Sequence, residues 1–286
     1  MTGHTERIRE RTVSPSPSPS GLGRAARPGL GAALAAELTK IFTLRWALWT
    51  LLSALALNVG LGALVALSFR NALSGPPTEG TRNFDPLFAA FFSLTIGQLA
   101  LVVFGVLTVG SEYSSGTIRA ALAAVPRRGR FYLAKVLATA LPVVVVAVGS
   151  AVVTFLTTQA VLGPYGVTPT AEGAPTAIIG AVVHLTLLSL FALGVAAMLR
   201  SSVRAMAVLL PVLFLGSMGL GNIPKVRTVT QFLPDQVGWV IMHLAGPPDD
   251  PRWARDYGPW TGLGILALWT AAALLGGYLV LRRRDA

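Results

Sequence analysis

Residues 47–69 read ALWTLLSALALNVGLGALVALSF and contain no Asp, Glu, Lys or Arg. As a helix rising about 1.5 Å per residue, this stretch is long enough to cross the roughly 30 Å hydrocarbon core of a bilayer. Five further uncharged stretches follow, at 87–110, 136–162, 176–199, 206–221 and 261–281. The pattern predicts an all-α integral membrane protein with six transmembrane helices.

The composition agrees with a membrane environment. Of the 286 residues, 53% are apolar and only 12% are charged, too few charges to cover a soluble core of that size. Cysteine is absent, which excludes disulfides, thiolate metal sites and cysteine nucleophiles.

The positive charges alternate with the apolar stretches. Seventeen of the 23 lysines and arginines fall in the N-terminal segment, the 111–135 loop, the 200–204 turn and the C-terminus. Positive residues concentrate on the cytoplasmic side of membrane proteins, so both termini are predicted to be cytoplasmic and the chain to be a multi-pass protein of the cell membrane. The net charge of +11 does not indicate nucleic acid, because no basic face lies outside the positions that flank lipid.

The N-terminal part divides into two segments. Residues 1–31 are polar, basic and rich in Ser-Pro, which predicts a disordered cytoplasmic tail ahead of a transmembrane domain at 32–286. From Ala32 to Arg45 the pattern becomes helical, with Glu37 and Lys40 on one face. The opposite face is apolar and holds Leu34, Leu38, Ile41 and Phe42. This segment is predicted to be an interfacial helix, and the alternative is that it extends the first membrane helix into water.

Two segments near the C-terminus are less regular. The stretch 206–221 is short and rich in glycine at its end, so it either crosses in full or ends inside a protein-lined cavity. After Pro234, with Asp235 and Gln236 in a first turn, a helical face is predicted from Val237, Val240, Ile241 and Leu244. It is too short to span and predicts a re-entrant or interfacial helix before the last membrane helix.

Motifs for stand-alone chemistry are missing. The sequence has no P-loop, no His-Glu-x-x-His and no Gly-x-Ser-x-Gly, and the predicted spans hold no carboxylate. No catalytic residue, metal site or cofactor is therefore predicted. His184, Gln98 and Gln159 lie within spans, where hydrogen bonds between segments explain them better than a proton relay or a ligand site.

The loop after the second stretch carries the most distinctive pattern. From Glu112 to Lys135 it reads EYSSGTIRAALAAVPRRGRFYLAK. Helix formers run from Thr117 to Ala124 and stop ahead of Pro126. The sequence predicts a short helix capped by Ser114 or Ser115, with a small exposed apolar face suited to docking on a partner. Ile118 and Leu122 would form that face.

The run Glu-Tyr-x-x-Gly-Thr-x-Arg, followed by Leu122, Pro126, the arginines and Lys135, resembles the segment after the second membrane helix of ABC-2 type ABC-transporter permeases. The resemblance implies a permease subunit, usually of an exporter, that pairs with a second copy or a similar subunit. ATP would be hydrolysed on a separate ABC ATPase, so the chain itself would not be an enzyme.

The same resemblance implies that 113–125 is a coupling helix seated on the ATPase. The implied coupling residues are Glu112, Tyr113, Gly116, Thr117, Ile118, Arg119 and Leu122. Gly116 and Thr117 would shape its start, and Arg119 would face the partner or a lipid phosphate. Glu112 would pair with Arg119 or Lys135, or contact the partner.

Two other classes of protein remain open. One is a non-conducting membrane anchor or assembly subunit that binds a cytoplasmic partner through the same loop. The other is a stand-alone enzyme or secondary transporter, which the uncharged spans disfavour.

Overall fold

The computed structural model describes residues 29–76, 79–125, 127–217, 219, 222–223, 225–246 and 253–283. Residues 1–28, most of the predicted disordered tail, lie outside this range. The first helix begins at Leu30, within the predicted tail.

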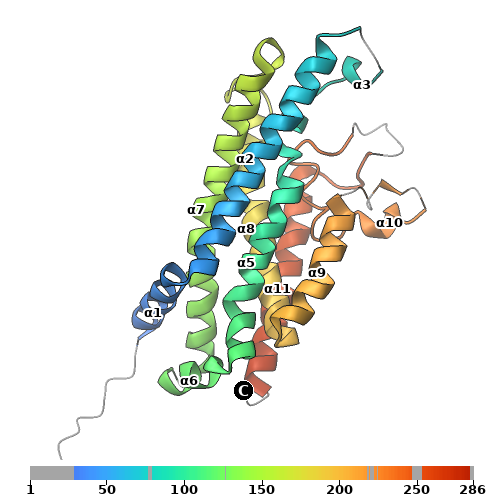
Figure 1. Cartoon of the computed structure of the whole chain (residues 1–286). Helices are drawn as coiled ribbons and strands as arrows, with labels where there is room; N and C mark the ends of the chain where they lie inside the picture. The colour runs from blue at the N-terminus through green and yellow to red at the C-terminus, as the bar shows by residue number, and fades with distance from the viewer. Residues whose placement is uncertain are drawn as a thin grey trace, which may run out of the picture.

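Among the described residues, five helical segments are long and apolar enough to cross a membrane. They are α2 (Arg45–Leu73), Pro86–Ser115, Arg128–Tyr165, α8 (Ala174–Leu199) and α11 (Pro259–Arg283). The second comprises α4 (Pro86–Phe91) and α5 (Leu94–Ser115), and the third comprises α7 (Arg128–Leu162) and the 3-10 turn η1 (Gly163–Tyr165). They run roughly along one direction (Figure 1). No strand occurs in the described part of the chain, so the protein is an all-α, multi-pass membrane protein.

The stretch predicted as the fifth span forms a shorter helix. α9 (Ser202–Ser217) is an apolar helix of 16 residues. At about 1.5 Å per residue its length is roughly 24 Å, less than the hydrocarbon core requires. α9 therefore does not belong with the five long helices.

Helix α8 lies against α5, α7 and α11, while α2 packs along α7. Small residues allow the closest of these contacts. A Cβ on Gly105 would lie 2.2 Å from the carbonyl oxygen of Ser189, and one on Gly194 would lie 2.6 Å from the backbone of Ala273. Glycines at such positions let membrane helices approach backbone to backbone.

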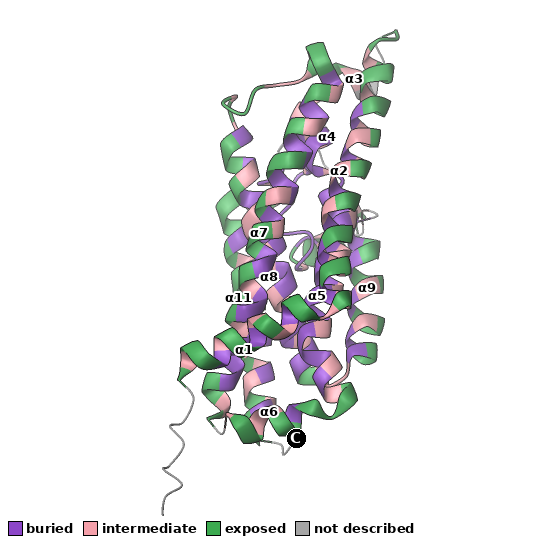
Figure 2. Ribbon diagram, turned by 60° about the vertical axis from the view of Figure 1, so that its left-hand side comes forward, coloured by how far each residue is buried: buried purple, intermediate pink, exposed green. Residues whose placement is uncertain are grey.

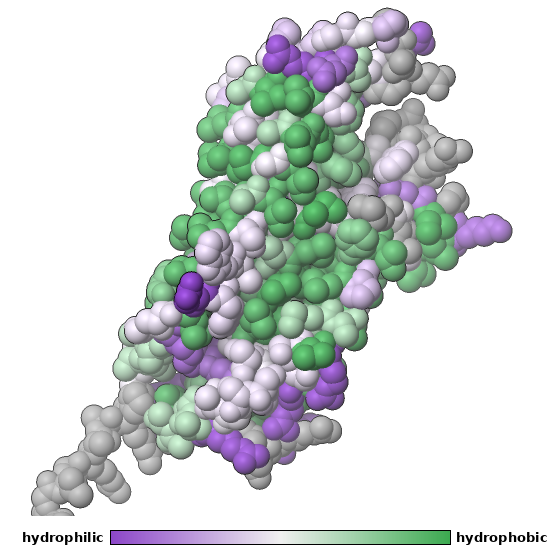
Figure 3. All heavy atoms as spheres, in the orientation of Figure 1, coloured by the Kyte–Doolittle hydropathy of each residue, from purple (hydrophilic) through white to green (hydrophobic). Residues whose placement is uncertain are grey.

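The outer surface of the bundle is apolar along its middle. Large exposed side chains include Leu64, Val145, Leu156 and Leu268, the last with 72% exposure. One face of the molecule shows hydrophobic side chains over the middle and hydrophilic ones toward both ends (Figure 3). Burial instead concentrates where the helices meet (Figure 2). This is the distribution expected of a bundle surrounded by lipid.

Helix α1 (Leu30–Thr43) is separate from α2. Leu44 adopts an extended conformation between them, which rules out one continuous helix extending into water. Figure 1 shows α1 beside α7 and turned away from the direction of α2. The buried face of α1 holds Ala33, Glu37 and Ile41, so it includes only part of the apolar stripe, and Phe42 is exposed.

The prediction of a helix after Pro234 is wrong. Residues 231–243 form consecutive turns, and the described helix in this region is α10 (Arg227–Thr230). Backbone hydrogen bonds there alternate between three-, four- and five-residue spacings, ending with Leu244 N donating to Trp239 O at 2.8 Å. Packing decides this conformation, since Trp239, Ile241 and Leu244 are buried in the bundle core.

Candidate functional site

The motif loop forms a tight junction between two helices. α5 ends at Ser115, Gly116 follows with φ of 73°, and α6 (Thr117–Ala124) begins at the next residue. A left-handed backbone costs little only for glycine, so Gly116 allows the chain to change direction in a single residue. α6 lies at one end of the bundle (Figure 1), here called the α6 end.

Helix α6 matches the predicted range, but its capping and its apolar face differ. No serine caps it, because Ser115 Oγ instead lies 2.9 Å from Thr117 Oγ1. Ile118 is 3% exposed, and Leu122 packs against the same core cluster. The apolar face predicted to be exposed therefore fixes α6 to its own bundle. The exposed face of α6 instead consists of Thr117, Arg119, Ala120, Ala123 and Ala124.

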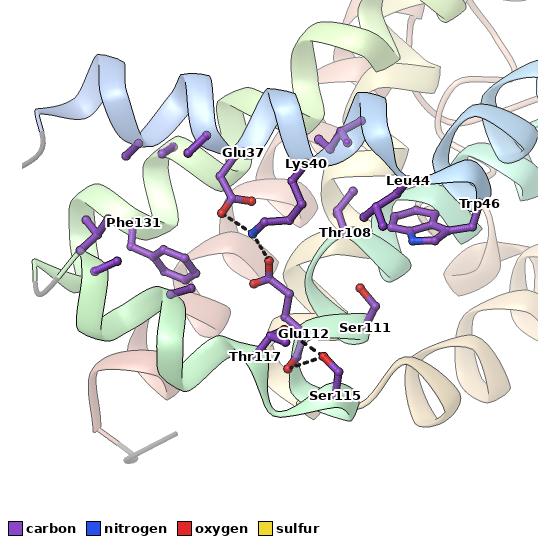
Figure 4. A pocket seen from close by; sticks show the side chains of 17 residues that line it. Glu37, Lys40, Leu44, Trp46, Thr108, Ser111, Glu112, Ser115, Thr117 and Phe131 are labelled. Carbon is purple, nitrogen blue, oxygen red and sulfur yellow. Dashed lines mark hydrogen bonds and ion pairs between the residues drawn. The ribbon is translucent and has the colours of Figure 1, made fainter.

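Beside α6, four charged side chains from three helices form one buried cluster, here called the ion cluster. Lys135 Nζ lies 2.7 Å from Glu37 Oε2 and 2.9 Å from Glu112 Oε1. Lys40 Nζ lies 2.8 Å from Glu37 Oε1 and 2.5 Å from Glu112 Oε1. Each carboxylate thus contacts both ammonium groups, and Figure 4 shows Lys40 between the two carboxylates.

The ion cluster joins α1, α5 and α7. Lys135 is 1% exposed, Glu112 5% and Glu37 7%, so three of the four charges have little contact with solvent. Lys135 also donates to the backbone carbonyl of Thr108 at 3.3 Å. The two positive and two negative charges cancel, which makes burial tolerable, whereas removing one partner would leave a buried charge uncompensated.

The pKa values of the two α1 residues reflect these contacts. Burial alone would raise the pKa of Glu37, but Lys135 and then Lys40 outweigh it and hold the pKa below its ordinary value. Burial would lower the pKa of Lys40, but hydrogen bonds to Glu112 and Glu37 outweigh it and raise the pKa. Both residues are therefore held in their charged forms.

For Glu112 the structure selects one of the predicted partners. Glu112 pairs with Lys135, and its other contact is Lys40 rather than Arg119. Because its side chain is buried, Glu112 is not available to a partner protein in this conformation. Sequence reasoning placed Glu37 and Lys40 on the polar face of α1 and did not identify them as site residues. The sequence did contain a signal, because acidic and basic residues stand singly beside the apolar stretches. Such charges need a partner of opposite sign wherever the helices bury them.

A cavity of about 580 Å³ opens against the ion cluster, here called the α1 cavity. Its walls come from α1, α5, α6 and α7, with Trp46 from α2. Glu37, Lys40 and Glu112 line one part, and most other lining residues are small or apolar (Figure 4).

Four other motif residues lie at a different cavity. Tyr113 is half-buried beneath the guanidinium of Arg200, 5.2 Å from the ring centre. Tyr113, Gly116, Ile118 and Arg119 line a second cavity of about 530 Å³. Glu112 and Thr117 thus line the α1 cavity, the four residues above line the second cavity, and Leu122 lines neither because it packs against the core.

Polar residues inside the long helices bond to other segments, as predicted. His184 on α8 lies 3.0 Å from the side-chain oxygen of Gln98 on α5. Gln159 on α7 donates to the carbonyl of Pro86 at 3.2 Å and accepts from Val167 N at 2.8 Å. Within the described residues, no three His, Asp or Glu side chains gather closely enough to share a metal ion.

No protein-family model matches this chain, and a comparison with curated proteins finds no significant match.

Proposed function

We propose that this chain is the membrane-spanning permease subunit of an ATP-driven ABC transporter of the ABC-2 type. Its partner would be a separate ATPase that docks on α6. Support comes from the motif Glu112–Arg119, from the all-α membrane fold, and above all from the way α6 is mounted.

The mounting of α6 is the observation that carries the proposal. Ile118 and Leu122 anchor one face of this helix in the core, while the opposite face is exposed. A short helix fixed to a bundle transmits a push to that bundle, whereas a flexible loop would absorb it. Its exposed residues are small apart from Arg119, so a groove on a partner could approach the backbone closely.

The distribution of positive charge favours a cytoplasmic location for the α6 end. This end carries Arg119, Arg128, Arg200, Arg204 and Arg282, consistent with the positive-inside rule. In this proposal the protein is in the cell membrane, both termini are cytoplasmic, and α9 is a short sixth span. The largely buried turns at 231–243 would complete the membrane domain where α9 ends.

The ion cluster suggests how motion would spread from α6. α6 is joined directly to the end of α5 through Gly116. Glu112 on α5 forms ion pairs with Lys40 on α1 and with Lys135 on α7. Nucleotide-driven closure of the ATPases would push α6 and move these helices together. Two permease subunits, identical or similar, would then rock around a central pathway to export substrate.

The first experiment purifies the protein from its native host in mild detergent and identifies any nucleotide-hydrolysing subunit that accompanies it. We expect a stoichiometric ATPase. Ala120→Glu and Ala123→Glu, on the exposed face of α6, should each release it. Ala35→Glu, at an exposed position of α1, is the matched control and should retain it.

Failure to recover an ATPase under conditions that preserve known transporter complexes would contradict the proposal. A bound ATPase whose turnover never responds to substrates in reconstituted membranes would instead identify a non-conducting anchor.

A further inference from the structure

The second cavity at the α6 end, here called the arginine cavity, has a different chemistry from the α1 cavity. Arg119 reaches it from α6, Arg200 from the turn after α8, and Arg204 from the first turns of α9. Three arginines thus line a space of about 530 Å³, and no acidic residue lines it among the described residues.

The backbone around Arg200 helps to bring these groups together. Arg200 adopts φ of 51°, a left-handed conformation that a non-glycine residue seldom takes. This residue ends α8 and lets α9 begin at Ser202, which places Arg204 at the same cavity as Arg200. The Arg200 guanidinium also lies over the ring of Tyr113.

Two of the three arginines of this cavity carry a charge that no described carboxylate neutralises. Arg119 and Arg204 are exposed, and neither forms an ion pair with a described residue. The nearby carboxylate of Glu112 points to the other side of the turn, where Lys40 and Lys135 neutralise it. Because Arg119 and Arg204 face this cavity without a described counter-charge, the cavity favours an anion, and the planar guanidinium fork suits phosphate oxygens.

The position of the cavity favours a lipid as the source of that anion. It lies where α5, α8 and α9 begin or end, which is where the apolar spans give way to polar residues. Apolar side chains lie next to it, with Met198 36% and Val203 71% exposed. Basic pockets between membrane helices at this depth bind the head groups of anionic lipids.

We propose that the arginine cavity binds the phosphate head group of an anionic phospholipid, with the acyl chains running along the apolar surface beside Met198 and Val203. The proposal concerns the purified chain alone. It therefore holds or fails independently of whether an ATPase docks on α6.

The test loads the delipidated protein in detergent micelles with phosphatidylglycerol and phosphatidylcholine of identical acyl chains, and measures retained lipid by native mass spectrometry. We expect preferential retention of phosphatidylglycerol. Arg119→Gln and Arg204→Gln should each weaken this retention about fivefold, the contribution of one basic residue at a lipid surface. Arg130→Gln, at an exposed arginine of the same end that does not line the cavity, is the matched control and should retain wild-type binding.

A charge-preserving variant separates binding from folding. Arg204→Lys should keep the wild-type melting temperature and lose part of the preference, because the ammonium lacks the bidentate fork. Equal retention of the two lipids, or equal effects of Arg204→Gln and Arg130→Gln, would overturn the proposal. So would competition by inorganic phosphate or by a soluble poly-glutamate peptide at the concentration of the lipid, which would assign the cavity to a free anion or to an acidic protein.

Discussion

The two cavities that flank α6 use charge in opposite ways. In the α1 cavity, Glu37 and Glu112 are buried and each is paired with Lys40 and Lys135. In the arginine cavity, Arg119, Arg200 and Arg204 converge without an acidic residue among the described lining. Glu112 and Arg119 are seven positions apart on either side of Gly116, yet one is internally neutralised and the other faces outward. A charged residue in a motif therefore reveals its role only through its burial and its partners.

The largest effect should follow from removing a shared partner of the ion cluster. Lys135→Ala leaves Glu37 and Glu112 buried with only Lys40 between them. We expect a loss of about 3–5 kcal/mol in the free energy of unfolding, the usual result of breaking a buried pair. Denaturant titration in detergent micelles measures it.

The control for this variant is Arg130→Ala, a basic residue on the same helix that is exposed to solvent. Its effect should lie within about 0.5 kcal/mol of zero. Equal losses of unfolding free energy for Lys135→Ala and Arg130→Ala would show that the buried, paired lysine is no more important for stability than an exposed arginine.

A double-mutant cycle should give the next largest effect. Glu37→Gln and Lys135→Gln remove the two ends of the 2.7 Å contact between α1 and α7. Their coupling energy should fall between about 0.5 and 3 kcal/mol, as for groups in one buried network.

A second cycle tests the pairing that the structure rejects. Glu112→Gln and Arg119→Gln should be additive, because Arg119 is exposed and forms no ion pair with the described residues of the ion cluster. Strong coupling between Glu112 and Arg119, with none between Glu37 and Lys135, would contradict this arrangement. It would show that Glu112 and Arg119 act in one site.

A smaller effect should appear in the pH dependence of stability. The pKa of Glu37 in the folded protein lies below its ordinary value of 4.5. The unfolded chain therefore takes up a proton first, and the stability present above pH 4.5 is lost as the pH falls through the lowered folded value. Melting temperatures measured between pH 6 and pH 3 should fall less steeply for Glu37→Gln than for the wild type.

Glu172→Gln provides the matched control for the acid titration. Glu172 is exposed, so its removal should leave the acid slope unchanged. An unchanged slope for Glu37→Gln would show that the ion cluster does not depend on the ionised carboxylate.

The smallest effect concerns the turn that separates the two cavities. Gly116→Ala places a Cβ on a residue with φ of 73°, although no neighbouring atom lies within 4 Å of it. The cost comes from the backbone alone and should be about 1 kcal/mol. Gly31→Ala, at an open position in α1, should instead be neutral or slightly stabilising. The same denaturant titration measures both, and equal effects would show that the left-handed turn is not required.

Local patterns in the sequence predicted the elements of this protein. The apolar stretch 47–69 lies within α2, and the helix formers before Pro126 became α6 at Thr117–Ala124. The same local logic failed at 237–244, where helical spacing of apolar residues predicted a helix and the chain forms buried turns. There the segment fits the space between other helices, so its packing overrides its own periodicity.

The charge contacts required the tertiary structure. Lys40 meets Glu112 across 72 positions of sequence, and Lys135 meets Glu37 across 98. Nothing within α1 distinguishes a polar face turned to water from one turned to a buried counter-charge. The sequence likewise predicted an exposed apolar face on α6, whereas the contacts of that face with the bundle bury it.

The sequence by itself determined that this protein lies in a membrane, since the transfer of an uncharged apolar helix into lipid depends on the side chains of that helix alone. It also determined where the short helix α6 begins and ends. Only the tertiary structure decided which charges cancel and which remain available, because an ion pair depends on the distance between helices that are remote in sequence.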